Sequence, residues 1–282
     1  MLAIRRILAT VRAGLRGIQM KRLLLASACL LAFVKMSSTQ AAAAALTIDG
    51  AYDNSVLGEG GGNVNGFDVN GAANVPLYWG NLSAELDVGD EGVGALHTFD
   101  GGGGVVWTDP DFRLAGTVVY NRGSAGGLHL EETTIGGGGE WYPRDWLTLG
   151  VQGGAIAGTF AGGFVGGTVK AYVTPDLSIA GFSTFSDWKV TFLQKFVEET
   201  DYGVKAEFLP SERIPLTIRA EYTRQQIGGF GGILGPAAHD NLLTLGVRLY
   251  LDDSWAPMPL VEHNRTGTLD TIGPIHPAWF NG

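Results

Sequence analysis

Five prolines recur at a nearly constant interval along this chain of 282 residues. Pro76, Pro110, Pro143, Pro175 and Pro210 lie 34, 33, 32 and 35 residues apart, and four of them stand in short polar clusters that are typical of turns. A period of about 34 residues also occurs in helical repeat proteins. The segments between the prolines argue against helices, because they alternate apolar and polar residues with period two and are rich in glycine.

Between successive proline turns lies a second, softer break, so each unit is interpreted as two strands joined by a loop. The alternation is clearest over 241–251, where Leu243, Leu245 and Val247 share one face while Thr244 and Arg248 share the other. Short turns at one end of the strands and longer loops at the other are typical of outer-membrane barrels. The expected strands are also long enough for a tilted membrane crossing, which takes about 9–11 residues.

Two further features favour a membrane barrel over a soluble β-sandwich, which would show the same alternation. The apolar faces are rarely interrupted by charge, and aromatic residues gather near strand ends, as in the interfacial girdles of membrane barrels. The expected girdle residues are Trp107, Tyr120, Trp141, Tyr142, Trp146, Trp188 and Tyr222. Closure into a barrel would remove the unpaired edges that so many strands otherwise expose.

The expected fold is therefore all-β, a transmembrane up-and-down antiparallel barrel over residues 46–251. The five proline turns divide this stretch into six units of two strands, which predicts twelve strands. Ten strands are the alternative, because the first unit is short and polar. Both counts are even, so both ends of the barrel are expected on the short-turn side, which is the periplasmic side of such barrels.

The first 45 residues are expected to be a secretory signal rather than part of the barrel. They hold seven basic residues and no acidic residue, and an apolar run over 23–34 precedes the alanines at 41–45. Met20 is a candidate for the true start, with 1–19 upstream of it. A mitochondrial transit peptide is the alternative, since such peptides are also rich in arginine and poor in acid.

The C-terminal tail, 252–282, follows the last expected strand. It holds four prolines together with Trp255, Trp279 and Phe280. Disorder is one expectation for it; folding back as a plug is the other, motivated by its aromatic residues.

Removal of the leader changes the charge of the chain. Lys plus Arg falls from 19 to 12 while Asp plus Glu stays at 28, so the formal charge of the mature chain becomes −16. This balance argues against nucleic acid as a partner. The single cysteine, Cys29, lies in the leader, so the mature chain is expected to lack disulfides and thiol metal sites.

The chain resembles the small porin-like outer-membrane barrels of Gram-negative bacteria over residues 46–251. The resemblance rests on the architecture and on the last strand, Thr244 to Leu251, which is similar to the polar-x-Gly-x-x-apolar-x-apolar signal that the barrel-assembly machinery recognises. The chain departs from many such barrels in having 31 residues after this strand. The resemblance implies a location in the outer membrane, with membrane lipid and the assembly machinery as partners.

The chain is expected neither to bind a cofactor nor to be an enzyme. The five histidines lack metal-ligand spacing, and the glycine runs at 101–104 and 136–139 lack the Lys-Ser or Lys-Thr of a phosphate loop. Some outer-membrane barrels are lipases with a serine and a histidine on the outer face. Here His129 lies near Glu131, and His239 precedes an acid, but no serine adjoins either histidine in sequence. A lipase is therefore kept only as an alternative.

Charged residues on the polar faces of the strands are expected to line the inside of the barrel. They are Glu85, Arg113, Lys170, Lys205, Glu207, Arg219, Glu221 and Arg248. Such residues either pair across strands and fill the interior or line a channel between inward glycines. The favoured function is a porin-like channel for passive diffusion of small hydrophilic solutes, with a weak preference for cations. A plugged structural or adhesive barrel is the other non-enzymatic alternative.

Overall fold

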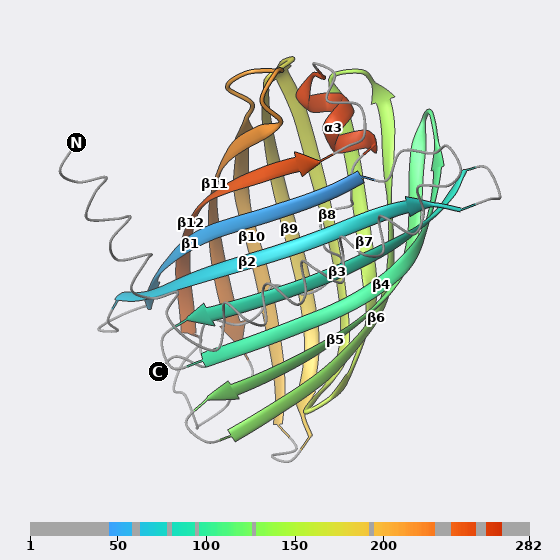
Figure 1. Ribbon diagram of the computed structural model, residues 1–282. Helices are drawn as coiled ribbons and strands as arrows, with labels where there is room; N and C mark the ends of the chain where they lie inside the picture. The colour runs from blue at the N-terminus through green and yellow to red at the C-terminus, as the bar shows by residue number, and fades with distance from the viewer. Residues whose placement is uncertain are drawn as a thin grey trace. The chain divides into compact units, whose positions relative to one another are not determined.

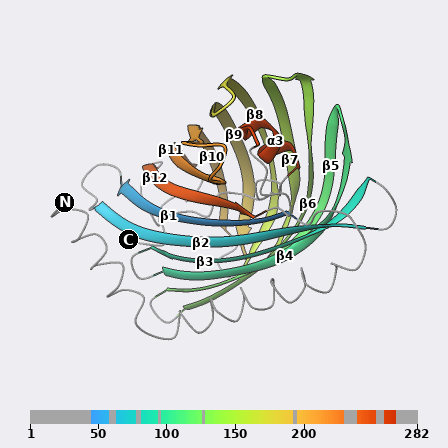
Figure 2. The same ribbon diagram turned by 45° about the horizontal axis from the view of Figure 1, so that its top comes forward.

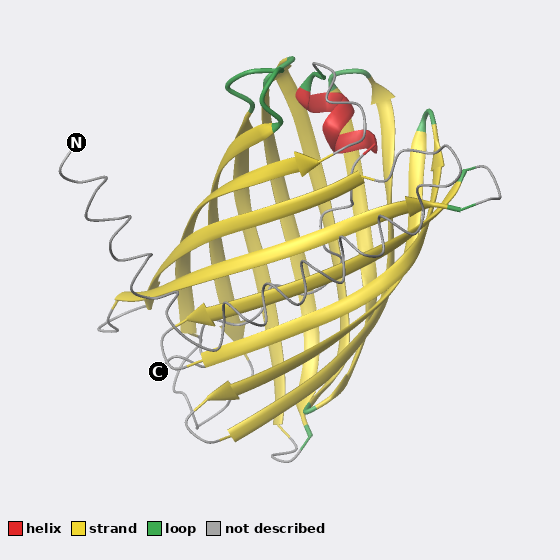
Figure 3. Ribbon diagram, viewed as in Figure 1, coloured by secondary structure: helices red, strands yellow, loops and turns green. Residues whose placement is uncertain are grey.

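Twelve antiparallel strands close into one barrel in the computed structural model (Figures 1 and 3). The structure describes residues 45–57, 63–77, 81–93, 96–125, 128–191, 195–228, 238–251 and 258–266. Around the barrel the order is β1-β12-β11-β10-β9-β8-β7-β6-β5-β4-β3-β2, so each strand pairs with its neighbours in sequence and β1 pairs with β12. This topology confirms the up-and-down barrel and the count of twelve strands rather than ten. The expected leader, Cys29 and most of the tail lie outside the described residues.

The strands all exceed the minimum length of a membrane crossing. They are β1 (Ala45–Leu57), β2 (Asn63–Pro76), β3 (Leu82–Val93), β4 (Leu96–Asp109), β5 (Phe112–Ala125), β6 (Leu128–Arg144), β7 (Leu147–Gly158), β8 (Phe160–Thr174), β9 (Leu177–Val190), β10 (Lys195–Phe208), β11 (Leu216–Gly228) and β12 (Ala238–Leu251). The one helix among the described residues is α3 (Leu260–Thr266). Among these residues, no helix has the length and apolar character to span a membrane.

Proline turns join the strands at one end of the barrel, which we call the proline end. Pro110 lies in the β4–β5 turn and Pro175 in the β8–β9 turn, where strand pairing continues to Thr174 and Leu177 on either side. In the latter turn the backbone N–H of Asp176 donates to the hydroxyl of Thr174 at 3.3 Å, an arrangement typical of short polar turns. Because Ala45 and Leu251 begin and end the barrel, both of its chain ends lie at the proline end.

The opposite end, here called the far end, lacks most of the longer loops that the sequence pattern predicts. Two residues separate β3 from β4, two separate β5 from β6, and one separates β7 from β8. The glycine-rich stretch 158–163 forms no long loop: β7 and β8 pair with each other as far as Ile156 and Gly162, and their tips continue to pair with β6 and β9. Gly158 makes the tight reversal possible with φ of 129°, a conformation that favours glycine. The gap between β11 and β12 is the longest at this end.

The outer face of the barrel is apolar around nearly its whole circumference. Large exposed apolar side chains occur on every strand except β3, among them Ile48, Val118, Val165, Val204 and Val247. A soluble monomer rarely exposes so extensive an apolar surface, whereas membrane barrels carry an outward apolar band. Helix α3 lies inside the rim at the proline end, beside β7, β8 and β9 (Figure 2).

Candidate functional site: the interior of the barrel

Alternation along each strand decides which side chains face the interior. In β9, Ser178, Thr184 and Ser186 are buried while Ile179 and Phe185 are exposed. Since the exposed set is large and apolar and the wall is closed, the buried set points inward. The same alternation defines the inner face of the other strands.

Ion pairs join neighbouring strands across the inner face near the proline end. The guanidinium Nη2 of Arg113 lies 2.7 Å from Oε2 of Glu140, and Nζ of Lys205 lies 3.2 Å from Oε2 of Glu221. The side chain of Arg113 is only 2% exposed, so the Glu140 carboxylate and nearby hydrogen-bond acceptors, rather than water, stabilise its positive charge.

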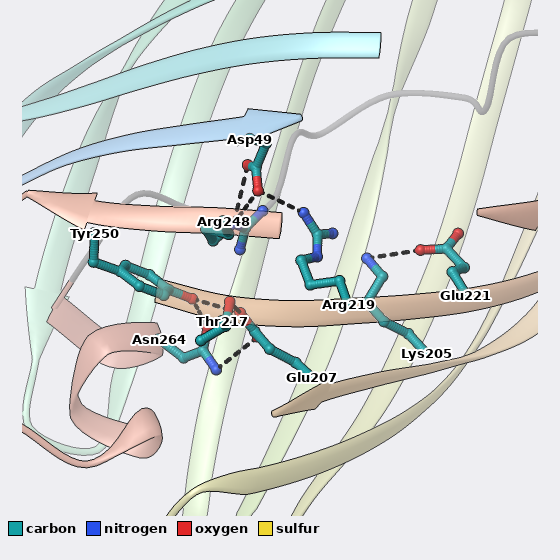
Figure 4. Close-up of polar contacts among 9 residues, drawn as sticks. All are labelled: Asp49, Lys205, Glu207, Thr217, Arg219, Glu221, Arg248, Tyr250 and Asn264. Atoms are coloured by element: carbon teal, nitrogen blue, oxygen red, sulfur yellow. Dashed lines mark hydrogen bonds and ion pairs between the residues drawn. The ribbon is translucent and has the colours of Figure 1, made fainter. Parts of the chain in front are cut away.

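Asp49 joins two strands that close the barrel. Its Oδ1 accepts from Arg219 Nη1 at 2.9 Å and from Arg248 Nε at 2.7 Å, linking β1 to β11 and β12 (Figure 4). Charge-assisted hydrogen bonds of this kind are stronger than neutral ones. The last strand is therefore fixed to the first by side chains as well as by the ladder.

Glu207 is a second junction, where β10, β11, β12 and α3 meet. It accepts from the hydroxyl of Thr217 at 2.7 Å and from Nδ2 of Asn264 at 3.3 Å, and the Tyr250 hydroxyl lies 2.8 Å away (Figure 4). Glu207 is buried, so these donors replace the water that its carboxylate would otherwise require.

Charge is distributed unevenly around the wall. The sequence contains no Lys or Arg between Lys35 and Arg113, so β1 to β4 carry carboxylates and no Lys or Arg. Among the side chains that the structure describes, the acidic residues on the inner face of these strands are Asp49, Asp53, Asp68, Glu85, Asp87 and Asp100. Among the described side chains, the inward Lys and Arg lie on β5 to β12, near the proline end of their strands. The Lys, Arg, Asp and Glu residues that β1–β4 themselves contribute are therefore purely acidic, and Arg219 and Arg248 reach one of them, Asp49, from β11 and β12.

Because Gly89 has no side chain, the side chains of Asn70 and Asp100 can approach each other within this acidic sector. A Cβ atom at Gly89 would lie 2.2 Å from oxygens of both Asn70 and Asp100. Asp87 lies one inward position from Gly89 along β3. Glycine here brings carboxylates from β3 and β4 close together.

An apolar cluster occupies the inner face of β7 to β11 toward the far end. It consists of Ile156, Phe160, Phe164, Trp188, Val190, Val197 and Ile227. Phe160 and Trp188 pack edge to face with ring centroids 4.8 Å apart, and the indole N–H of Trp188 donates to Glu199 Oε2 at 3.2 Å. This part of the interior is filled by side chains rather than by solvent.

The sequence-based set of lumen residues lies on the inner face in the structure. Glu85, Arg113, Lys170, Glu207 and Arg248 are buried there, and Lys205, Arg219 and Glu221 are partly exposed. Sequence reasoning missed their partners Asp49, Glu140, Tyr250 and Asn264, although inward parity on neighbouring strands could have suggested Asp49 and Glu140.

Five of the expected girdle residues point outward, and two do not. Trp107, Tyr120, Trp141, Trp146 and Tyr222 are exposed on the outer face or in a turn. The girdle assignment was wrong for Trp188 and Tyr142, which are buried inside the barrel. Trp188 belongs to the apolar cluster, and the Tyr142 hydroxyl donates to Glu140 at 2.9 Å. Position near a strand end does not show which face a residue occupies. Alternation along the strand does, because successive side chains point to opposite faces.

The histidines give little support for chemistry among the residues that the structure describes. No cluster of three or more His, Cys, Asp or Glu side chains there could hold a metal ion. His263 is buried in α3 and stacks on Tyr250 with ring centroids 4.6 Å apart. The register does place Ser124 opposite His129 on the outer face of β5 and β6, but no hydrogen bond joins the two in the described part of the chain.

Comparison with known proteins identifies the fold. No protein-family model matches the chain, and no curated protein matches its sequence. Among solved structures, the COG4313 outer membrane channel from Pseudomonas putida F1 is similar with a TM-score of 0.52 and 12% identity, over 76% of this chain and 97% of the other. The KdgM porin gives a TM-score of 0.48 at 11% identity over 72% and 98% of the two chains, and the NanC porin 0.47 at 11% over 73% and 100%. The likeness to the Pseudomonas putida channel, at 12% identity, shows a shared closed-barrel fold.

Proposed function

We propose that the chain is a porin-like channel of an outer membrane that lets small hydrophilic solutes diffuse passively, with a preference for cations. The apolar outer face supports insertion into lipid. The inner face carries charged residues, so a solute inside the barrel would meet a polar wall.

One observation carries the channel proposal: inward side chains on β10 and β11 are partly exposed. Lys205 and Glu221 pair with each other, yet their side chains remain 22% and 20% exposed. A side chain on the inner face of a closed barrel gains such exposure only from space inside the barrel. Twelve strands are intermediate between small barrels filled by side chains and wide porins, which is consistent with a narrow path.

The cation preference rests on the acidic sector β1–β4. Strands that contribute carboxylates to the wall and no Lys or Arg favour cations and repel anions, and rings of acidic side chains select cations in other channels. The formal charge of −16 expected for the mature chain acts in the same direction.

An outer-membrane location is also part of this proposal. The N-terminal leader would direct export, and the last strand, Thr244 to Leu251, would be read by the barrel-assembly machinery. The proline end, with both ends of the barrel, would face the periplasm, and outer-membrane lipid would surround the apolar face.

The test is the reversal potential of the refolded protein in a planar bilayer under a KCl gradient. We expect single-channel conductance with a reversal potential on the cation-selective side. Substitution of Asp87→Asn together with Asp100→Asn should reduce this selectivity. Absence of conductance would contradict the channel, and anion selectivity would contradict the charge argument.

Asp187→Asn is the matched control for that experiment. Asp187 is exposed on the outer face of β9, so this substitution removes a carboxylate without altering the inner wall. If it changed selectivity as much as the substitutions at Asp87 and Asp100, the preference would come from net charge rather than from the acidic sector.

A lipase is the second candidate, favoured by the register of Ser124 and His129. A serine nucleophile requires a histidine within hydrogen-bond reach, and cross-strand partners lie close enough for small side-chain movements to bring them together. Hydrolysis of a labelled phospholipid by the refolded barrel, lost in both Ser124→Ala and His129→Ala, would support this candidate. Equal activity in those variants would remove it.

A further inference from the structure

Two neighbouring carboxylates on the inner face of β10 are buried without a basic side chain opposite them. Glu199 and Asp201 are each 1% exposed. They are successive inward residues of the strand, with Cα atoms about 7 Å apart. The residues paired with them in the two adjoining ladders are uncharged: Thr184, Ser186, Gln225 and Ile227. Two negative charges would therefore lie together here without an opposite charge across the ladder.

Glu199 is surrounded by hydrogen-bond donors that fix the direction of its carboxylate. The indole N–H of Trp188 donates to Oε2 at 3.2 Å, and the amide Nε2 of Gln225 donates to Oε1. The hydroxyl of Ser186 also donates to this carboxylate. An ionised carboxylate has about four acceptor positions, so three donors orient Glu199 and leave one position for a cation. Hydrogen bonds orient the carboxylate ligands of metal sites in the same way.

Asp201 has the opposite surroundings. Neither of its buried carboxylate oxygens has a hydrogen-bond partner among the described residues. The amide of Gln225, directly across the ladder, donates to Glu199 instead. On the other side, the hydroxyl of Thr184 lies toward Gly166 of β8, 2.8 Å from where a Cβ atom of that residue would stand. An ionised carboxylate buried without donors is strongly unfavourable, so Asp201 requires a cation or a proton as its partner.

The basic side chain of this wall has another partner. Lys205 is the basic residue among the described inward side chains of β10, two inward positions from Asp201, and its Nζ lies 3.2 Å from Oε2 of Glu221. Because Lys205 is 22% exposed, space inside the barrel reaches this part of the strand. A hydrated ion can therefore approach the carboxylates from the interior.

The available ligand atoms favour a hard divalent cation. They are all oxygens, from two carboxylates, one hydroxyl and one amide: Glu199, Asp201, Ser186 and Gln225. Two carboxylates balance a charge of two, and metals such as zinc prefer nitrogen and sulfur ligands. Mg²⁺ keeps several water molecules, whereas these four side chains are buried. Ca²⁺ accepts about 6–8 oxygens in an irregular arrangement and fits this set better.

We propose that one calcium ion binds on the inner face of the barrel to Glu199, Asp201, Ser186 and Gln225. The ion joins β9, β10 and β11 through side chains, beside the apolar cluster to which Trp188 belongs. This inference goes beyond the proposed channel function, because ion binding at a fixed site and conduction are separate properties. Calcium that binds the folded barrel and not the unfolded chain stabilises the folded state.

The experiment measures binding of Ca²⁺ and of Mg²⁺ to the refolded full chain in detergent micelles by titration calorimetry. We expect one Ca²⁺ per barrel and weaker binding of Mg²⁺. Asp201→Asn keeps the shape of the side chain and removes its charge, so it should weaken Ca²⁺ binding by about tenfold or more. Glu198→Gln is the matched control, because Glu198 is exposed on the outer face of the same strand and its substitution should leave binding unchanged.

Terbium luminescence gives a second measurement, which locates the ion. Tb³⁺ replaces Ca²⁺ at oxygen sites and emits when a tryptophan close to it is excited. Because Trp188 donates to Glu199, the refolded chain should show sensitised emission that added Ca²⁺ removes. Trp188→Phe should abolish most of this emission, whereas Trp107→Phe, on the outer face, should not.

The possible results separate a calcium site from its alternatives. Absence of Ca²⁺ binding would overturn the inference, and a higher urea unfolding midpoint in Asp201→Asn would then assign a proton to Asp201. Equal weakening in Asp201→Asn and Glu198→Gln would also overturn it, because the bound ions would lie on the outer surface. If Asp201→Asn does not fold, Glu199→Gln and Ser186→Ala replace it, and undiminished Ca²⁺ binding in both would overturn the site.

Discussion

An aromatic residue near a strand end can point outward or into the barrel, because neighbouring residues along a strand point to opposite faces. Trp141 is exposed on the outer face of β6, whereas its neighbour Tyr142 is buried and bonded to Glu140. Composition near the strand ends could not distinguish these two positions. The parity of the inner face, which Arg113 and Glu140 define for this pair of strands, does distinguish them.

Arg113 provides the sharpest prediction at the scale of one residue. Arg113→Ala leaves Glu140 without its partner and removes a contact to α3, and loss of one member of a buried ion pair costs about 3–5 kcal/mol. Urea unfolding of the folded barrel should show a loss of this order. Arg122→Ala is the control, because Arg122 and Glu131 lie 3.9 Å apart on the exposed surface and such pairs contribute about 0–1 kcal/mol. Similar losses in the two variants would show that Arg113 is not an essential partner.

At the scale of the strand and its turns, the sequence predicted the number of strands and the proline turns well, and the connections at the far end poorly. Twelve strands and the positions of Pro110 and Pro175 in turns follow from alternation and from the rigidity of proline. The connections at the far end were expected to be longer, because glycine and small residues there resemble loop composition. In the structure these residues continue the ladder, and Gly158 provides the reversal.

At some glycines of the wall the neighbouring strand lies so close that a side chain would clash with it, whereas at others there is space. A Cβ at Gly203 would lie 2.1 Å from the carbonyl oxygen of Tyr222 and 2.8 Å from Phe182, whereas nothing lies within 4 Å of one at Gly116. Gly203→Ala should therefore destabilise the barrel by about 1–3 kcal/mol, the usual cost of overpacking. Gly116→Ala should be tolerated. Urea unfolding midpoints of the two variants test this, and equal midpoints would mean that the wall relaxes around Gly203.

At the scale of the whole molecule, the side chains that were hardest to foresee are those that connect distant parts of the sequence. Asp49 and Arg248 meet only because the first and last strands pair, and Asn264 meets Arg113 only because the tail returns to the barrel. Period-two patterns report which face a residue occupies, but not which strand lies opposite it across the interior. The candidate site was therefore predicted as a set of inward residues without its ion pairs.

The apolar outer face leads to a prediction about the surroundings of the molecule. Val151 is exposed in β7, and arginine at the midplane of a membrane barrel costs about 2–4 kcal/mol, falling to about 0–1 near the interfaces. Val151→Arg should therefore weaken folding into lipid vesicles, while Ser124→Arg, near the end of β5, should have little effect. The readout is the free energy of unfolding in vesicles. No difference between the two variants would place the outer face in water rather than lipid.

Pairing of β1 with β12 has a consequence for the timing of assembly. Leu46 and Leu251 pair although they stand at opposite ends of the barrel sequence, so the first strand keeps one unpaired edge until the last strand is in place. Contacts this far apart in sequence carry the largest entropy of loop closure, and long-range β pairing is correspondingly slow. The seam is then the last part of the wall to form, and until it forms the nascent barrel is an open sheet exposed to aggregation.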